Sequence, residues 1–133
     1  MARNEDIKID ELSIAIEKAL QDYAQDSTDV IKEEVIRVGE ETTKELKQIS
    51  PRSKKRGKHY ANGWRSKTAY ESEDDIRVVV YNATKPQLTH LLENGYAKVN
   101  GGRVDGIPHI SVALKHAGEK LDADIKAVVK GDT

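Results

Sequence analysis

Helical periodicity over the first fifty residues sets the strongest limit on how this chain can fold. Apolar residues recur at three- and four-residue intervals over 7–23, and the same spacing resumes over 30–49. One straight helix over 5–49 would be about 65 Å long, whereas a compact chain of this length is only about 35 to 40 Å across. The sequence therefore predicts two helices that separate near Ser27, or one helix that projects from the body.

Two later segments carry the pattern of β-strands. Residues 64–71 alternate aromatic or hydroxyl side chains with mostly charged ones, and 76–83 (IRVVVYNA) has the highest β-branched content in the chain. The acidic run ESEDD lies between them. The simplest pairing of the two strands is an antiparallel hairpin.

A glycine-rich segment, LLENGYAKVNGGRVDGIPH over 91–109, follows from a predicted short helix. Gly95 is typical of a helix end, and Gly101 and Gly102 permit the positive φ angles of a tight turn. We therefore expect a hairpin or flexible tongue at this place in the chain.

Together these patterns predict an α+β fold in a single domain over 1–133. Its expected elements are two N-terminal helices, an antiparallel β-hairpin or small sheet, a short helix, the glycine-rich tongue and a C-terminal helix packed on the sheet, which Ser111 caps. Hydrophobic residues make up 37% of the chain and aromatic residues 5%, with no Phe. Because such a core is thin, burial against partner subunits would stabilise it.

Composition and charge exclude several classes of function. The chain has no Cys, which removes disulfides, thiolate catalysis and Cys-based zinc sites. A net charge of -1 argues against a surface wholly committed to nucleic acid. Acidic residues interrupt the apolar stretches of the N-terminus, and no later stretch is long enough to cross a bilayer. We therefore expect no signal peptide and no membrane span.

The titratable residues form no recognisable catalytic or metal-binding motif. The i, i+4 spacing of helical metal ligands is absent among the four histidines, His59, His90, His109 and His116. Glu93 and Asp105 could be read as an acid/base pair, but no nucleophile or oxyanion site accompanies them. We therefore expect no enzyme activity, no metal and no cofactor, and an enzyme is the third of the hypotheses for this chain.

A basic run lies between the long helical region and the first predicted strand. It comprises Arg52, Lys54, Lys55, Arg56 and Lys58. Clustered cations displace counterions from phosphates, and the neighbouring rings of Tyr60 and Trp64 could stack on bases. A small nucleic-acid-binding module that contacts DNA through this run is therefore the alternative function.

Two segments, ISPRSKKRGKHYANGWR and LTHLLENGYAKVNGGRVDGIPHI, resemble the tail-completion or head-tail joining proteins of long-tailed double-stranded DNA bacteriophages. The resemblance implies a non-enzymatic structural protein of the virion neck, present in the bacterial cytoplasm during assembly. It also implies a homo-oligomeric ring, by analogy with tail symmetry a hexamer, that contacts other neck and tail proteins. Transient contact with phage DNA stays open.

The same resemblance implies an assembly interface built around the tongue. Its expected residues shape the tongue rather than perform chemistry, and they are Glu93, Gly95, Gly101, Gly102, Arg103, Pro108 and His109. The glycines would let residues 97–106 leave the body as a mobile hairpin that orders on assembly. Pro108 and His109 would then anchor its return to the last helix.

Overall fold

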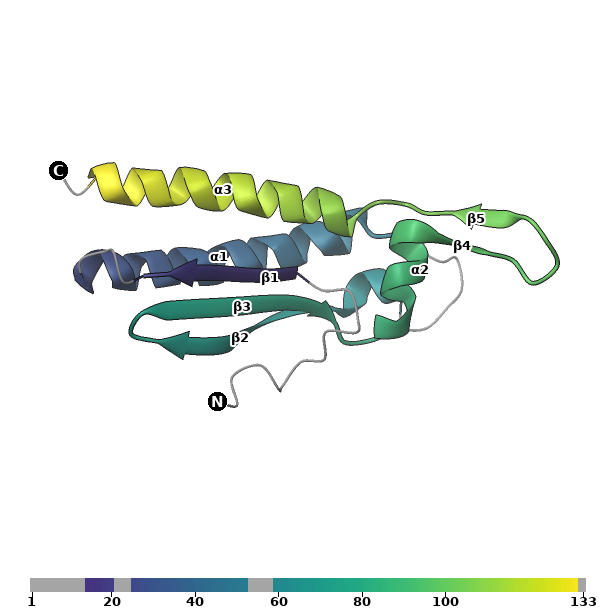
Figure 1. Cartoon of the computed structure of the whole chain (residues 1–133), viewed down its shortest axis with the longest axis horizontal. Helices are drawn as coiled ribbons and strands as arrows, with labels where there is room; N and C mark the ends of the chain where they lie inside the picture. Colours follow the sequence, from purple (N-terminus) through teal and green to yellow (C-terminus); the bar gives the residue numbers. More distant parts are fainter. Residues whose placement is uncertain (1–13, 21–24, 53–58, 132–133) are drawn as a thin grey trace.

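The computed structural model describes residues 14–20, 25–52 and 59–131, and the largest elements in these ranges are two long helices, a three-stranded sheet and a projecting hairpin (Figure 1). In chain order the elements are β1 (Ile14–Ala19), α1 (Gln25–Ile49), η2 (Tyr60–Gly63), β2 (Trp64–Ser72), β3 (Asp75–Asn82), η3 (Pro86–Leu88), α2 (Thr89–Asn94), β4 (Gly95–Ala97), β5 (Arg103–Asp105) and α3 (Ile110–Gly131), where η marks a 3-10 helix. The predicted α+β class is confirmed.

The prediction of a first helix over 7–23 is wrong in its described part. Residues 14–19 form β1, which pairs antiparallel with β3 and sets Ile14 opposite Val80 and Ile16 opposite Val78. The stretch IAIEKA combines alternation of period two with good helix formers, so the local pattern allows both structures. Pairing with β3 favours the strand over the helix, because both isoleucines are buried in the strand. The other residues of the predicted helix, apart from Leu20, lie outside the described ranges.

The predicted hairpin of β2 and β3 is confirmed, and with β1 it forms a sheet of order β1-β3-β2. The register shifts between Thr68 and Tyr70, which marks a bulge in β2. On β3, Ile76, Val78 and Val80 alternate with residues of the other face and join the core. The strand with the strongest β-branched signal is therefore the central one.

The second predicted helix is confirmed as α1, which contacts β2 and β3 and turns an apolar stripe toward them. Its fully buried residues Ile31, Val35, Val38 and Leu46 follow helical spacing. Alongside it, α3 runs in the opposite direction (Figure 1). The buried stripe of α3, from Ile110 to Ile125, belongs to the same core as the strands. At the end where α1 finishes and α3 starts, the chain sends out the tongue.

Candidate assembly site: the tongue and its base

The tongue, defined as residues 95–106, is an antiparallel hairpin that projects beyond the helices and the sheet (Figure 1). β4 pairs with β5 so that Tyr96 lies opposite Val104. The amide of Lys98 donates to the carbonyl oxygen of Gly102 at 3.0 Å, which closes the loop. Gly101 and Gly102 have φ angles of 96° and 81°, as the sequence predicted for a tight turn. The hairpin is therefore confirmed.

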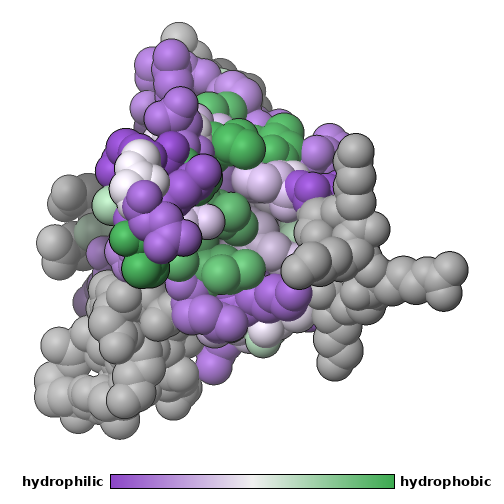
Figure 2. All heavy atoms as spheres, turned by 90° about the vertical axis from the view of Figure 1, so that its right-hand side faces the viewer, coloured by the Kyte–Doolittle hydropathy of each residue, from purple (hydrophilic) through white to green (hydrophobic). Residues whose placement is uncertain are grey.

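Large apolar side chains lie exposed on the tongue and beside its base. Val99 at the tip is fully exposed, Tyr96 is 40% exposed, and Leu91 and Ile107 near the base are 41% and 52% exposed. Figure 2, which views this end of the molecule, shows apolar surface gathered between polar side chains. Contiguous apolar surface that a chain leaves uncovered is typical of a site for a protein partner.

Glu93 joins the two ends of the tongue. It lies in the last turn of α2, just before the tongue, and its carboxylate accepts hydrogen bonds from the first amides of α3, just after the tongue. Oε1 is 2.7 Å from the amide nitrogens of His109 and Ile110, and Oε2 is 3.1 Å from that of Ser111. These groups have no partner within the helix, so the carboxylate caps α3 and complements its dipole.

The capping role predicted for Ser111 is therefore wrong. The first intrahelical bond of α3 runs from the amide of Ala113 to the carbonyl oxygen of His109, which makes His109 the residue at the N-cap. Ser111 already lies within the helix, and a side chain distant in sequence supplies the cap. A local cap motif cannot reveal a partner that lies 18 residues earlier in the chain.

His109 connects the N-cap of α3 to the buried interior of the protein. Its fully buried ring has Nδ1 2.7 Å from the carbonyl oxygen of Ile107 and 3.1 Å from Oε1 of Glu93, while Nε2 is 2.8 Å from the hydroxyl of Tyr60. With a proton on Nδ1, the ring can donate to the carbonyl oxygen of Ile107 and to Oε1 of Glu93, and Nε2 can accept from the hydroxyl of Tyr60. The ring also packs edge-on against Tyr60 and Trp64, with centroids 5.6 and 6.3 Å away.

Further hydrogen bonds tie this cluster to the sheet and to α1. The indole nitrogen of Trp64 donates to the hydroxyl of Ser50 at 2.8 Å, and the side-chain amide of Asn82 donates to the carbonyl oxygen of Tyr60 at 2.7 Å. We call Glu93, His109, Tyr60, Trp64 and Asn82 the base cluster. All five residues are buried. The tongue is therefore anchored on the end of the central strand.

The electrostatics of the base cluster favour an ionised Glu93 and a protonated Tyr60. Burial raises the pKa of the Glu93 carboxyl. The hydrogen bonds from the backbone of His109, Ile110 and Ser111 lower this pKa by more than burial raises it, so the net pKa lies below its ordinary value. Burial, together with the charge of Glu93, raises the pKa of the Tyr60 hydroxyl. The hydroxyl accordingly keeps its proton and can donate it to Nε2 of His109.

Two glycines let the backbone of α2 and the end of β5 approach each other at the base. Gly95 has a φ of 80°, and a Cβ there would lie 2.4 Å from the carbonyl oxygen of Val104. A Cβ on Gly106 would lie 2.4 Å from the carbonyl oxygen of Glu93. The amide of Ile107 donates to the carbonyl oxygen of Leu92 at 2.8 Å in the same place. Side chains are excluded here because backbone packs on backbone.

The predicted interface residues fall into two groups. Gly101, Gly102, Arg103 and Pro108 are exposed, and the guanidinium of Arg103 donates to the carbonyl oxygen of Asn94 at 2.8 Å. Glu93 and His109 are buried beneath them, with Gly95 between the groups. Their participation in an assembly interface stays a prediction. Sequence reasoning missed Tyr60 and Asn82 as parts of this site, because nothing local links them to the tongue.

The basic run is described only at Arg52. Its exposed guanidinium donates to the carbonyl oxygen of Lys47 at 2.7 Å and to Oδ1 of Asn62 at 3.2 Å. Lys54, Lys55, Arg56 and Lys58 lie outside the described residues. The interpretation of Tyr60 and Trp64 as base-stacking rings is wrong, because both are buried in the base cluster. DNA contact through the cations stays a prediction, which replacement of all five by Ser and a salt titration of binding would test.

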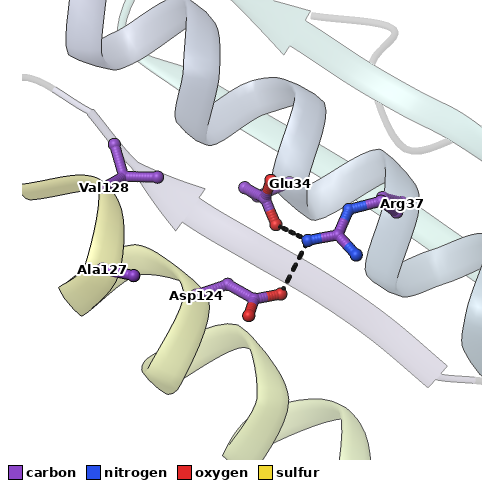
Figure 3. A pocket seen from close by; sticks show the side chains of 5 residues that line it. All are labelled: Glu34, Arg37, Asp124, Ala127 and Val128. Atoms are coloured by element: carbon purple, nitrogen blue, oxygen red, sulfur yellow. Dashed lines mark hydrogen bonds and ion pairs between the residues drawn. The ribbon is translucent and has the colours of Figure 1, made fainter. Parts of the chain in front are cut away.

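A shallow depression of about 260 Å³ between α1 and α3 offers no comparable site (Figure 3). Arg37 on its wall pairs with Glu34 and lies 3.0 Å from Asp124, so the charged side chains there are already paired with one another. In the described ranges, no group of three or more histidines and carboxylates is arranged to hold a metal ion. None of the helices described is both long and apolar enough to cross a membrane.

Comparison with known families decides the affiliation of the chain. Residues 14–95, more than half of its length, match the family model HK97-gp10_like, described as "Bacteriophage HK97-gp10, putative tail-component". The chain belongs to the HK97-gp10-like family. The resemblance to bacteriophage tail and head-tail joining proteins is thus confirmed, and the family places the chain among structural phage proteins.

The match to the HK97-gp10-like family runs from the start of β1 through α2 and stops at Gly95, where the tongue begins. It therefore includes Glu93 but not the remainder of the tongue or α3. No curated protein and no solved structure matches the chain. The residues of the tongue itself therefore carry the information on what it contacts.

Proposed function

We propose that this protein acts in head-tail joining or tail completion at the neck of a siphophage virion, as a non-enzymatic structural component. The observation that carries the proposal is the tongue, an apolar arm that projects from the body while its base is fixed inside it. Membership in a family of phage tail components supplies the setting. An arm of this kind suits docking between ring-shaped assemblies of the portal and the tail.

The tongue is the part that meets a neighbouring neck or tail protein. Val99 and Tyr96 provide apolar contact area, and burying an exposed side chain of this size on a partner contributes about 1.5 to 3 kcal/mol. Lys98 and Arg103 flank them and add polar contacts at the rim. Gly101 and Gly102 let the tip turn tightly between the two strands.

The protein also forms a homo-oligomeric ring, which by analogy with tail symmetry is a hexamer. A ring needs a heterologous contact, in which one surface of a copy meets a different surface of the next copy and the rotation between copies closes. Light scattering on the purified protein measures this directly. A mass of six chains supports the ring, whereas a monomer at all concentrations restricts ring formation to the assembled neck.

Deletion of the gene from the phage or prophage that carries it tests the joining role. Electron microscopy of the resulting lysate should show DNA-filled heads and separate tails, and a plasmid copy of the gene should restore joined virions. Normal virions from the deletion strain would rule out the proposed function. Heads without DNA would instead place the protein in an earlier step of assembly.

A further inference from the structure

We propose that Glu93 is a positioning residue that fixes the direction in which the tongue leaves the body. This inference rests on the proposed function of the tongue as a docking arm, and it identifies the residue that holds the arm in one direction. The tongue would then meet its partner as a preset arm whose tip alone adapts. The sequence had suggested a hairpin that is mobile as a whole until assembly.

The position of Glu93 gives it leverage over both strands of the tongue. The residue belongs to the helix that leads into β4, and its carboxylate holds the amides of His109, Ile110 and Ser111, which follow β5. Rotation of the tongue about its base would pull α2 away from the start of α3. Such a movement would break charge-assisted hydrogen bonds of a buried carboxylate, which are costly to lose.

The carboxylate is itself held in place from beneath. His109 contacts it through Nδ1 and is hydrogen-bonded to the hydroxyl of Tyr60 through Nε2, and Asn82 at the end of β3 fixes the backbone of Tyr60. The close backbone contact at Gly106 leaves no space for the base to shift toward α2. Glu93 therefore transmits the orientation of the sheet to the tongue.

The tip of the tongue lacks these restraints. Among the described residues, chain neighbours aside, no heavy atom lies within 4 Å of where a Cβ on Gly101 or Gly102 would stand, and Val99 is fully exposed. A fixed base lowers the conformational entropy that docking must remove, while a free tip can still adjust to the partner surface. Glu93 thus sets the direction of the tongue, and residues 98–102 at its tip adapt to the partner surface.

A distance measurement tests the proposal, and the absence of Cys from the chain makes it direct. Spin labels are placed at Ala97→Cys, an exposed position in strand β4 of the tongue, and at Glu40→Cys, an exposed position on α1. Pulsed electron paramagnetic resonance then compares the parent with Glu93→Gln, with Glu93→Asp and with Glu119→Gln, a matched control on the exposed face of α3. Amide exchange in β2 and β3 checks that each variant is folded.

We expect one narrow distance in the parent and in Glu119→Gln, a broad distribution in Glu93→Gln and an intermediate width in Glu93→Asp. Amides of Ile110 and Ser111 should exchange about tenfold faster in Glu93→Gln, since local opening becomes easier when a charge-assisted bond is lost. A broad distribution in the parent would overturn the proposal. So would a narrow one in Glu93→Gln, or in Glu93→Asp if the glutamine variant does not fold.

The outcome is independent of the proposed head-tail role, because the labels report on the purified chain. A narrow distance in folded Glu93→Gln would remove the positioning role and leave the docking arm. Normal virions from the deletion strain would remove the docking role while the distances stayed as they are.

Discussion

The body of this protein and its tongue are stabilised in opposite ways. In the body, α1, α3 and the three strands enclose a continuous apolar core whose larger members are almost fully buried. In the tongue, two three-residue strands carry exposed apolar side chains, and polar hydrogen bonds of one carboxylate hold the base. The difference separates the residues that fold the chain from the residues that we propose meet a partner, because the two sets lie in different places.

The largest effect is expected in the body at Trp64. Its ring is fully buried, packs on Tyr60 with centroids 5.6 Å apart, and donates to Ser50. Trp64→Ala should lower the free energy of unfolding by about 3 to 5 kcal/mol, measured by urea denaturation. The control Val99→Ala should stay within about 0.5 kcal/mol of the parent. Equal losses of unfolding free energy in the two variants would contradict the distinction between a stabilising body and a tongue that adds little to stability.

A smaller loss is expected at Glu93, where the two regions meet. Glu93→Gln should lower the free energy of unfolding at pH 7 by about 1 to 3 kcal/mol, because the amides of α3 lose an ionised acceptor. The folded pKa of Glu93 lies below the ordinary value of 4.5, so the carboxylate stabilises the fold fully above that pH. Its contribution is lost as the pH falls through the folded pKa.

Urea denaturation of the parent and of Glu93→Gln at a series of pH values checks this sign. The difference in stability should be constant near neutrality and should shrink in acid. Glu119→Gln, at an exposed position on α3, should show no such trend. A gap that widens in acid would show that Glu93 is held protonated in the folded chain.

Two glycines of the tongue should respond differently to the same substitution. Gly95→Ala should cost about 1 to 2 kcal/mol or more, since its φ is positive and the new Cβ would meet the carbonyl oxygen of Val104. Gly101→Ala also places a side chain at a positive φ. The exposed tip can adopt another turn, so the loss of unfolding free energy should be smaller there. Thermal unfolding of both variants measures the contrast. Equal losses would mean that the tip is as constrained as the base.

The smallest expected effect is a gain on the outer face of α3. In the described part of the chain, nothing outside the adjacent residues and the backbone of α3 itself lies within 4 Å of where a Cβ on Gly118 would stand, so Gly118→Ala should raise the free energy of unfolding by about 0.5 to 1 kcal/mol. The same variant sharpens the comparison in phage assembly. If it were more stable but failed to join heads to tails, the outer face of α3 would also contact a partner.

The sequence predicted those elements whose own residues carry the signal. The long stripe of α1, the β-branched run of β3 and the glycine turn of the tongue all lie where the local pattern placed them. β1 was misread because IAIEKA suits a helix as well as a strand until β3 is available to pair with it. The base cluster escaped detection for a related reason, since Tyr60, Glu93 and His109 meet only in the folded chain.

The most direct test of the account is to complement the deleted gene with variants at two matched apolar positions. Val99→Asp alters the tip of the tongue, and Val30→Asp alters a residue of α1 that is 41% exposed. Counted by electron microscopy, Val30→Asp should restore joined virions and Val99→Asp should leave heads and tails apart, with both purified proteins equally stable. Full restoration by Val99→Asp would contradict the claim that the tongue is the docking arm.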